Sequence, residues 1–214
     1  MKDRFEIDFT KYTVPSRSFF SRDTLNVAKE LLGAYIRHET PDGVVGGMIV
    51  ETEGYIYNEP GCHAFVGETQ RNRAMFGPPG HAYTYFTYGM YWMFNIVTEK
   101  AGRGCAVLIR AVEPVEGIEL MRKRRPKAKR DVDLANGPGK LAMALGIGRE
   151  QYGLDLLASP LTVLIPPKPL RNRILKQYGG IVQTTRIGLG AGRGDELQYR
   201  FYMREHPGVS FVVS

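Results

Sequence analysis

The sequence predicts an α+β fold built around a largely antiparallel β-sheet. Segments with strand character follow one another along the chain, often separated only by a turn, while helical stripes are few and scattered. Hydrophobic residues make up 43% and charged residues 24% of 214 residues, a composition typical of a globular protein. This length suffices for one large domain or two small ones with a real core.

The first third of the chain is expected to hold a helix followed by two strands. The helix spans Ser21–Leu32, where leucine and alanine recur at helical spacing, Ser21 or Asp23 can cap the first turn, and Gly33 ends it. The two strands that follow, joined by a Pro-Asp-Gly turn, span Ala34–Glu39 and Val44–Ile56.

The rest of the chain is expected to alternate short helices and strands. Arg71–Phe76 forms a short helix before a Gly-Pro-Pro-Gly stop, and Glu116–Arg124 forms another. Asn136 can cap a further helix, with Pro138 in its first turn, that ends at Leu145 before a glycine. The expected strands, of which the last three lie in a region richer in Pro and Gly, are Ala82–Thr87, Tyr91–Val97, Cys105–Val112, Thr162–Ile165, Gln198–Met203 and Val209–Val213.

The net charge of +7 is concentrated in one segment, Met121–Arg130, which holds seven basic residues and no acid. Such a block suits a polyanion, because neutralising phosphates releases counterions; a solvated loop that aids solubility is the alternative, and an anionic membrane fits less well.

No secretory signal and no apolar run near the ~20 residues of a membrane span is present. Cys62 and Cys105 form no metal or disulfide framework, so we expect a cytosolic, reduced protein without a zinc site.

The segment from Glu51 to Tyr55 is the strongest candidate for chemistry. Side chains alternate along a strand, so Glu51, Glu53 and Tyr55 are expected to share one face. Two carboxylates and a phenol are costly to bury without partners, which favours a chemical role for at least one of them. A solvated strand face is the alternative.

A group of aromatic residues follows, with Tyr83, Tyr85, Tyr88 and Tyr91 within nine positions. Aromatic residues favour strands, and half of these could simply face the core. Tyr88 lies in an expected tight turn, however, where an exposed ring can wedge into a base stack, and the other rings can stack on a nucleobase.

Isolated polar residues mark further candidates. Arg110 interrupts an apolar strand and needs a carboxylate or phosphate partner, either in a site or in a structural ion pair. Asn95 is a similar intrusion with a satisfied core amide as the alternative, and His63 is a lone histidine of the kind that is more often structural. The segment Asn136–Lys140 lacks the spacing and the hydroxyl residue of a phosphate loop, although Lys140 near a helix start could hold a DNA phosphate.

Several short motifs in one order resemble the alkyladenine (3-methyladenine) DNA glycosylase family of the vertebrate, monofunctional type. The resemblance spans roughly Phe19 to Val213, and the ordered set is more specific than any single motif. The motifs are Val50–Tyr55, His63, Arg71–Phe76, Tyr85–Tyr91, Asn95, Leu108–Pro114, Gly137–Leu141, Arg186–Gly188 and Arg200–Tyr202.

The resemblance implies a DNA repair hydrolase that excises 3-methyladenine, 7-methylguanine, hypoxanthine and ethenoadenine from double-stranded DNA. It implies one domain over residues 1–214 around a curved antiparallel sheet, acting as a monomer without metal, cofactor or membrane. Such a protein is expected in the cytoplasm with the nucleoid in a bacterium, or in the nucleus of a eukaryote.

The family's functional residues fall on positions already singled out. The resemblance assigns the general base to Glu53, the arginine near the attacking water to Arg110, base-pocket contacts to Tyr55, His63 and Tyr85, discrimination against guanine to Asn95, and intercalation to Tyr88. Arg122, Arg124 and Lys140 are expected to contact DNA phosphates.

Two alternatives follow from the same residues. A damaged-DNA-binding protein without activity would keep the wedge and the pocket, but it gains nothing from Glu53 facing DNA. A glycosylase with lyase activity needs a desolvated lysine, for which Lys140 is the candidate. Glu51 is expected to be structural, paired with a buried cation, and 159–183 receives no function.

Overall fold

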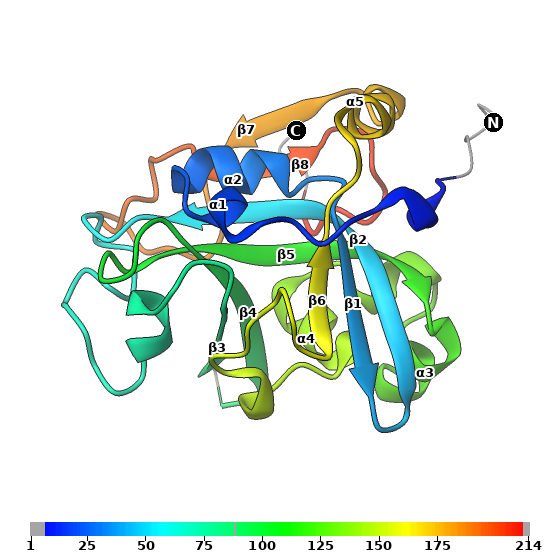
Figure 1. The fold of residues 1–214 in the computed structure, drawn as a ribbon, viewed down its shortest axis with the longest axis horizontal. Coiled ribbons are helices and arrows are strands. Elements are labelled where there is room, and N and C mark those ends of the chain that lie inside the picture. The colour runs from blue at the N-terminus through cyan, green and yellow to red at the C-terminus, as the bar shows by residue number, and fades with distance from the viewer. Residues whose placement is uncertain (1–6, 88, 212–214) are drawn as a thin grey trace.

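One continuous antiparallel sheet of eight strands organises the computed structural model, which describes residues 7–87 and 89–211 (Figure 1). This confirms the predicted α+β class. Every pairing among the strands is antiparallel, and the main order is β3-β4-β5-β2-β1-β6, with β8 beside β2 and β7 beside β8. The strands are β1 (Tyr35–Thr40), β2 (Gly43–Tyr55), β3 (Ala82–Thr87), β4 (Tyr91–Thr98), β5 (Cys105–Glu116), β6 (Leu161–Leu164), β7 (Ile181–Thr184) and β8 (Arg200–Met203).

The long strand β2 divides between two neighbours along one edge. Its first half pairs with β1, and Glu51–Glu53 pairs with β8, while β5 follows the other edge. The two carboxylates of β2 therefore lie where three strands meet.

Five α-helices among the described residues cover this sheet. In Figure 1, α2 lies above β2 and β5, and α4 lies below them. Apolar side chains of both helices, such as Val27 and Leu141, are fully buried in the main core. The helices are α1 (Arg17–Phe20), α2 (Thr24–Glu30), α3 (Ile118–Arg124), α4 (Pro138–Leu145) and α5 (Lys168–Gln177).

The predicted elements of the first half are largely confirmed, with changes at their ends. The expected helix Ser21–Leu32 is shorter because Asp23 caps α2, accepting a hydrogen bond from the Asn26 amide at 2.9 Å. The strand predicted to end at Val112 continues to Glu116 as the rest of β5. The short helix predicted at 71–76 is a 3-10 turn over Arg73–Phe76.

The start of α4 corrects a predicted cap. Gly137, not Asn136, is the N-cap residue, and Asn136 instead accepts a hydrogen bond from the Lys140 ammonium at 2.8 Å. The predicted stop is confirmed, because Gly146 takes a left-handed conformation with φ of 66° and its amide closes the last turn.

The C-terminal third departs most from expectation. Helix α5 was not predicted, because Pro167 and Pro169 are typical of a loop, although the first turn of a helix tolerates proline. The short strand β7 was not predicted either. The strand predicted over Val209–Val213 is wrong for 209–211, which lie outside any strand, while 212 and 213 lie outside the described residues.

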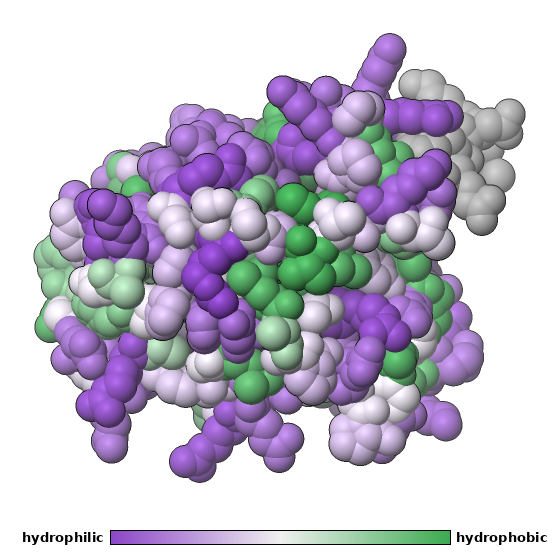
Figure 2. Space-filling view, viewed as in Figure 1, coloured by the Kyte–Doolittle hydropathy of each residue, from purple (hydrophilic) through white to green (hydrophobic). Residues whose placement is uncertain are grey.

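The surface is mostly polar. Figure 2 shows apolar side chains gathered at the centre of one face, over β6 and the N-terminal segment that crosses it. No helix of the described part of the chain is long and apolar enough to cross a membrane.

Candidate active site

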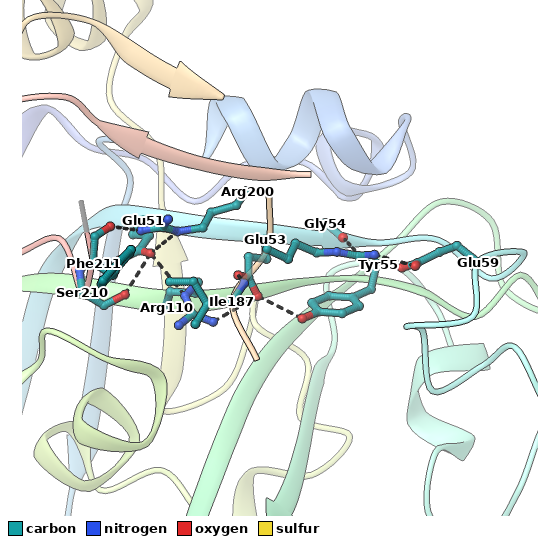
Figure 3. Close-up of polar contacts among 11 residues, drawn as sticks. Glu51, Glu53, Gly54, Tyr55, Glu59, Arg110, Ile187, Arg200, Ser210 and Phe211 are labelled. Carbon is teal, nitrogen blue, oxygen red and sulfur yellow. Dashed lines mark hydrogen bonds and ion pairs between the residues drawn. The ribbon is translucent and has the colours of Figure 1, made fainter. Parts of the chain in front are cut away.

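An arginine on β5 joins the two carboxylates of β2 (Figure 3). Arg110 Nε donates to Glu51 Oε1 at 3.2 Å, and its Nη1 donates to Glu53 Oε2 at 3.1 Å. The pairing of β2 with β5 shifts register at this point, leaving Arg110 without a strand partner of its own. Such irregularities re-aim side chains, and here the shift brings Arg110 onto the face of the carboxylates.

The carboxylate of Glu51 is a structural anchor. It is fully buried and accepts hydrogen bonds from Arg200 Nε at 2.6 Å and from the backbone and hydroxyl of Ser210 at 2.7 and 2.9 Å. Arg200 is itself fully buried and also donates to the carbonyl of Phe211. The predicted pairing of Glu51 with a buried cation is confirmed.

The carboxylate of Glu53 is held differently. Its Oε2 accepts from the Tyr55 hydroxyl at 2.9 Å and from Arg110, and its Oε1 accepts from the Ile187 amide at 2.8 Å. An ionised carboxylate has about four acceptor positions, so three donors leave one for a further ligand such as water. The shared face predicted for Glu51, Glu53 and Tyr55 is confirmed by these contacts.

Charge is balanced within this group. Burial lowers the pKa of Arg110, but the neighbouring carboxylates of Glu53 and Glu51 outweigh it and raise that pKa above the ordinary arginine value. Burial and the Glu53 carboxylate raise the pKa of Tyr55 well above its usual value, so the phenol stays protonated and donates.

A cavity of about 680 Å³ opens in front of the buried acids. The structure brings five of the predicted site residues to its wall, while Glu53 is 0% exposed and lies behind the wall formed by Tyr55, Arg110 and Ile187. The predicted residues at the wall are Tyr55, His63, Tyr85, Asn95 and Arg110.

Aromatic rings form one side of this cavity. The His63 and Tyr85 rings meet edge-to-face with centroids 4.5 Å apart, and Tyr83 lies 5.5 Å from Tyr85. His63 Nδ1 and the Tyr83 hydroxyl share a hydrogen bond of 2.8 Å. Burial against these groups, together with the Arg71 guanidinium, lowers the pKa of His63, so its imidazole is neutral at pH 7.

The predicted discriminating amide lies at the same wall. Asn95 on β4 is 4% exposed, and its Nδ2 donates to the carbonyl of Tyr83 across the strand pair at 3.0 Å. This bond fixes the orientation of the amide, so the side chain presents a defined polar edge to the cavity.

A buried ion pair behind Tyr55 was not predicted. Arg186 donates to both oxygens of Glu59, to the Gly54 carbonyl at 3.0 Å and to the Gly194 carbonyl at 3.0 Å. Its guanidinium lies 4.6 Å from the centre of the Tyr55 ring. Arg186 therefore ties the loop that carries Ile187 to the strand end that carries Tyr55.

The residues expected to contact DNA phosphates are less clearly placed. Arg122 pairs with Asp131 at 2.6 Å, and Arg124 donates to the last turn of α4 and to Asp42 at 3.3 Å. Lys140 is exposed and bonded to Asn136, so the three phosphate contacts stay predictions.

Two further expectations concern the turn after β3 and the absence of a metal. Tyr88 lies outside the described residues, so its intercalation stays a prediction. Within 7–87 and 89–211, no group of three His, Cys, Asp or Glu side chains is placed to hold a metal ion. Both cysteines are buried and unpaired with each other.

Comparison with known proteins points to one family. A family model described as methylpurine-DNA glycosylase matches residues 18–207. A protein of Carboxydothermus hydrogenoformans is 46% identical over 194 residues, covering 91% of this chain and 97% of the relative. Relatives from Methanocella arvoryzae and Rubrobacter xylanophilus are 46% and 47% identical, covering 91% and 80% of this chain and 94% and 84% of their own lengths. All three are described as candidate 3-methyladenine DNA glycosylases.

Proposed function

Because the chain belongs to the methylpurine-DNA glycosylase family, we propose that it excises alkylated and deaminated purines from duplex DNA with a water activated by Glu53. The chain is a DNA repair glycosylase, an enzyme that acts on N-glycosyl bonds. The observation that carries the proposed reaction is an aromatic cavity whose wall of Tyr55, Arg110 and Ile187 lies directly against the buried Glu53 carboxylate, which has one acceptor position left.

The volume and the aromatic lining of the cavity support binding of an extruded purine nucleotide. A base inside a duplex hides its glycosidic bond, so the enzyme must flip the nucleotide out at a cost of a few kcal/mol. The volume lies within the roughly 300–1,000 Å³ of ligand pockets, and the rings of Tyr55, His63 and Tyr85 offer surfaces for stacking. Electron-poor alkylpurines are attracted to aromatic faces by roughly 0.5–2 kcal/mol each. Tyr88 would fill the gap left in the base stack.

In the proposed reaction, Glu53 would act on a water at the end of this cavity. A water would donate a hydrogen bond to the acceptor position of Glu53 that Arg110, Tyr55 and Ile187 leave open. The carboxylate would then take the proton of this water as the water oxygen bonds to the anomeric carbon. The N-glycosidic bond breaks and the free base leaves, with charge on the sugar that an anion stabilises. An alkylated purine leaves readily, whereas neutral hypoxanthine needs a proton from water or a side chain.

Specificity would come from Asn95. Its amide is held by the Tyr83 carbonyl and cannot turn freely, so the exocyclic amine of normal guanine would clash with it. Purines without that group at this edge, such as hypoxanthine and ethenoadenine, would be admitted. The base 7-methylguanine carries the same amine, so its release would depend on the ease with which an alkylated purine leaves.

Single-turnover cleavage of duplexes that carry hypoxanthine, ethenoadenine or 7-methylguanine tests this function. We expect release of at least one of these bases and no release from an undamaged duplex of the same sequence. Tight binding of all three without release of any would favour a damaged-DNA-binding protein. Lys140 is exposed rather than desolvated, so we expect no covalent adduct after borohydride treatment.

A further inference from the structure

The segment Cys62–Thr69 displays large apolar side chains at the mouth of the cavity. Cys62 and Ala64 point inward and are buried with Met75 in a second hydrophobic cluster. Phe65 and Val66 lie at the cavity wall but are 52% and 78% exposed. Exposed apolar groups that lie together beside a ligand cavity are typical of a surface that contacts a partner.

Buried hydrogen bonds hold this segment in place. Asn72 is 3% exposed; its Nδ2 donates to the carbonyls of His63 at 2.8 Å and Gly67 at 2.9 Å, and its Oδ1 accepts from the Thr69 amide at 2.6 Å. Gly67 turns the chain with φ of 87°. The outward position of the two apolar side chains is therefore built into the segment rather than being the result of a loose loop.

The surroundings favour nucleic acid as the partner. Arg71 and Arg193 line the same cavity, and Glu68, the acid that follows the apolar pair in the chain, pairs with Arg73 at 3.2 Å. Cations attract the phosphates on either side of a flipped nucleotide, while apolar side chains pack on bases or sugars.

We propose that Phe65 and Val66 form a second DNA-contacting tip that packs against the bases flanking the flipped nucleotide. This proposal rests on the proposed function, because the flipped nucleotide defines where the flanking bases lie. Thr87, at the end of β3, lines the same cavity, and Figure 1 shows the segment 60–72 and the far end of β3 at the same side of the molecule. The segment that carries Phe65 and Val66 and the end of β3 would then hold the duplex open on either side of one pocket.

The test compares affinity for a duplex carrying a tetrahydrofuran abasic analogue with affinity for the same strand left single. Phe65→Ser should weaken binding of the duplex by about tenfold, the lower part of the range for one base–aromatic stack. Single-strand binding should change much less, and Phe65→Leu should recover most of the loss. Val66→Ser should act in the same direction, whereas Val14→Ser, an exposed valine away from the cavity, should not.

Binding to the abasic analogue requires no chemistry, so this result stands apart from the proposed function. Equal losses for the duplex and the single strand would mean that Phe65 contacts only the strand that enters the pocket, not the flanking bases of a duplex, and would overturn the proposal. Wild-type affinity of Phe65→Ser for the duplex would overturn it as well. Failure of the wild-type protein to release any base would remove the proposed reaction, while the comparison of affinities would still decide the role of the tip.

Discussion

Replacing Glu51 by glutamine is expected to destabilise the fold far more than it slows excision. The carboxylate is fully buried and accepts hydrogen bonds from Arg110 at 3.2 Å, from Arg200 at 2.6 Å and from two groups of Ser210. Glutamine removes the negative charge that the guanidiniums of Arg110 and Arg200 face. Its NH2 group would also replace the oxygen that accepts from the Ser210 N–H, leaving two donors face to face. Arg200, itself 0% exposed, then lacks its counter-charge.

The size of the effect follows from this burial. Removing one partner of a buried ion pair costs about 3–5 kcal/mol, against about 5–15 kcal/mol for the stability of a typical protein. For a chain of this length, the midpoint of thermal unfolding should fall by roughly 6–20 °C. Excision measured at a temperature where the variant is folded should stay close to that of the wild type.

Urea unfolding followed by circular dichroism measures this loss, with Glu53→Gln as the matched control. In the control, Arg110 keeps Glu51 and the Ile187 amide keeps an oxygen acceptor, so the loss of stability should be smaller. The double variant that adds Arg200→Met should be less destabilised than the sum of the single variants. A urea midpoint of Glu51→Gln equal to that of the wild type would refute this reasoning. A free energy of unfolding lower for Glu53→Gln than for Glu51→Gln would refute it as well.

Three further outcomes are expected. Tyr55→Ala should weaken binding of lesion DNA by roughly 5- to 150-fold through the loss of one stacked ring, measured by fluorescence anisotropy, whereas Tyr55→Phe should retain affinity and alter only the excision rate through Glu53. The pKa of His63 is lowered below the ordinary value of 6.5, so the imidazole is neutral at pH 7. When the pH falls through this lowered pKa, His63 gains a positive charge beside Arg71. Affinity for DNA that carries the cationic base 7-methylguanine should then decrease as the pH is lowered, because like charges repel. The variant His63→Gln should lose this pH dependence. Arg124→Ala should cost about 1–3 kcal/mol in urea unfolding, because its guanidinium bonds the last turn of α4. It should also weaken DNA binding measured by fluorescence anisotropy if Arg124 contacts a phosphate as predicted, and unchanged affinity in the folded variant would remove that contact.

Alternation along β2 was enough to predict the shared face of the site. The bonds from Arg110 to both carboxylates and from Tyr55 to Glu53 confirm it. The division of labour between the acids depends on residues far along the chain, because Arg200 and Ser210 lie 149 and 159 positions from Glu51. No local pattern contains contacts of that separation.

The ion pair behind Tyr55 shows a second limit of prediction. Glu59 lies in a turn-like segment before Pro60, where a charged residue is normally solvated, yet it is 6% exposed and bound to Arg186. Its burial results from the return of the chain around Arg186, which the sequence near Glu59 does not signal. The same holds for β7, which exists because β8 offers it an edge.

The basic block shows how charge counting along the chain can mislead. Met121–Arg130 holds no acid, but Arg122 pairs with Asp131 just beyond it and Arg124 pairs with Asp42 from the β1–β2 turn. Part of the positive charge is therefore balanced within the fold. The predicted contact of this block with DNA therefore stays a prediction, and basic residues of the block that have no acidic partner would favour it.

Single-turnover excision of hypoxanthine by Glu53→Gln tests the central claim, that Glu53 activates the attacking water. We predict a rate lower by about 10²–10⁴-fold, the usual contribution of a general base, with affinity for the abasic-analogue duplex retained. Excision at the wild-type rate by a correctly folded Glu53→Gln variant would contradict the account.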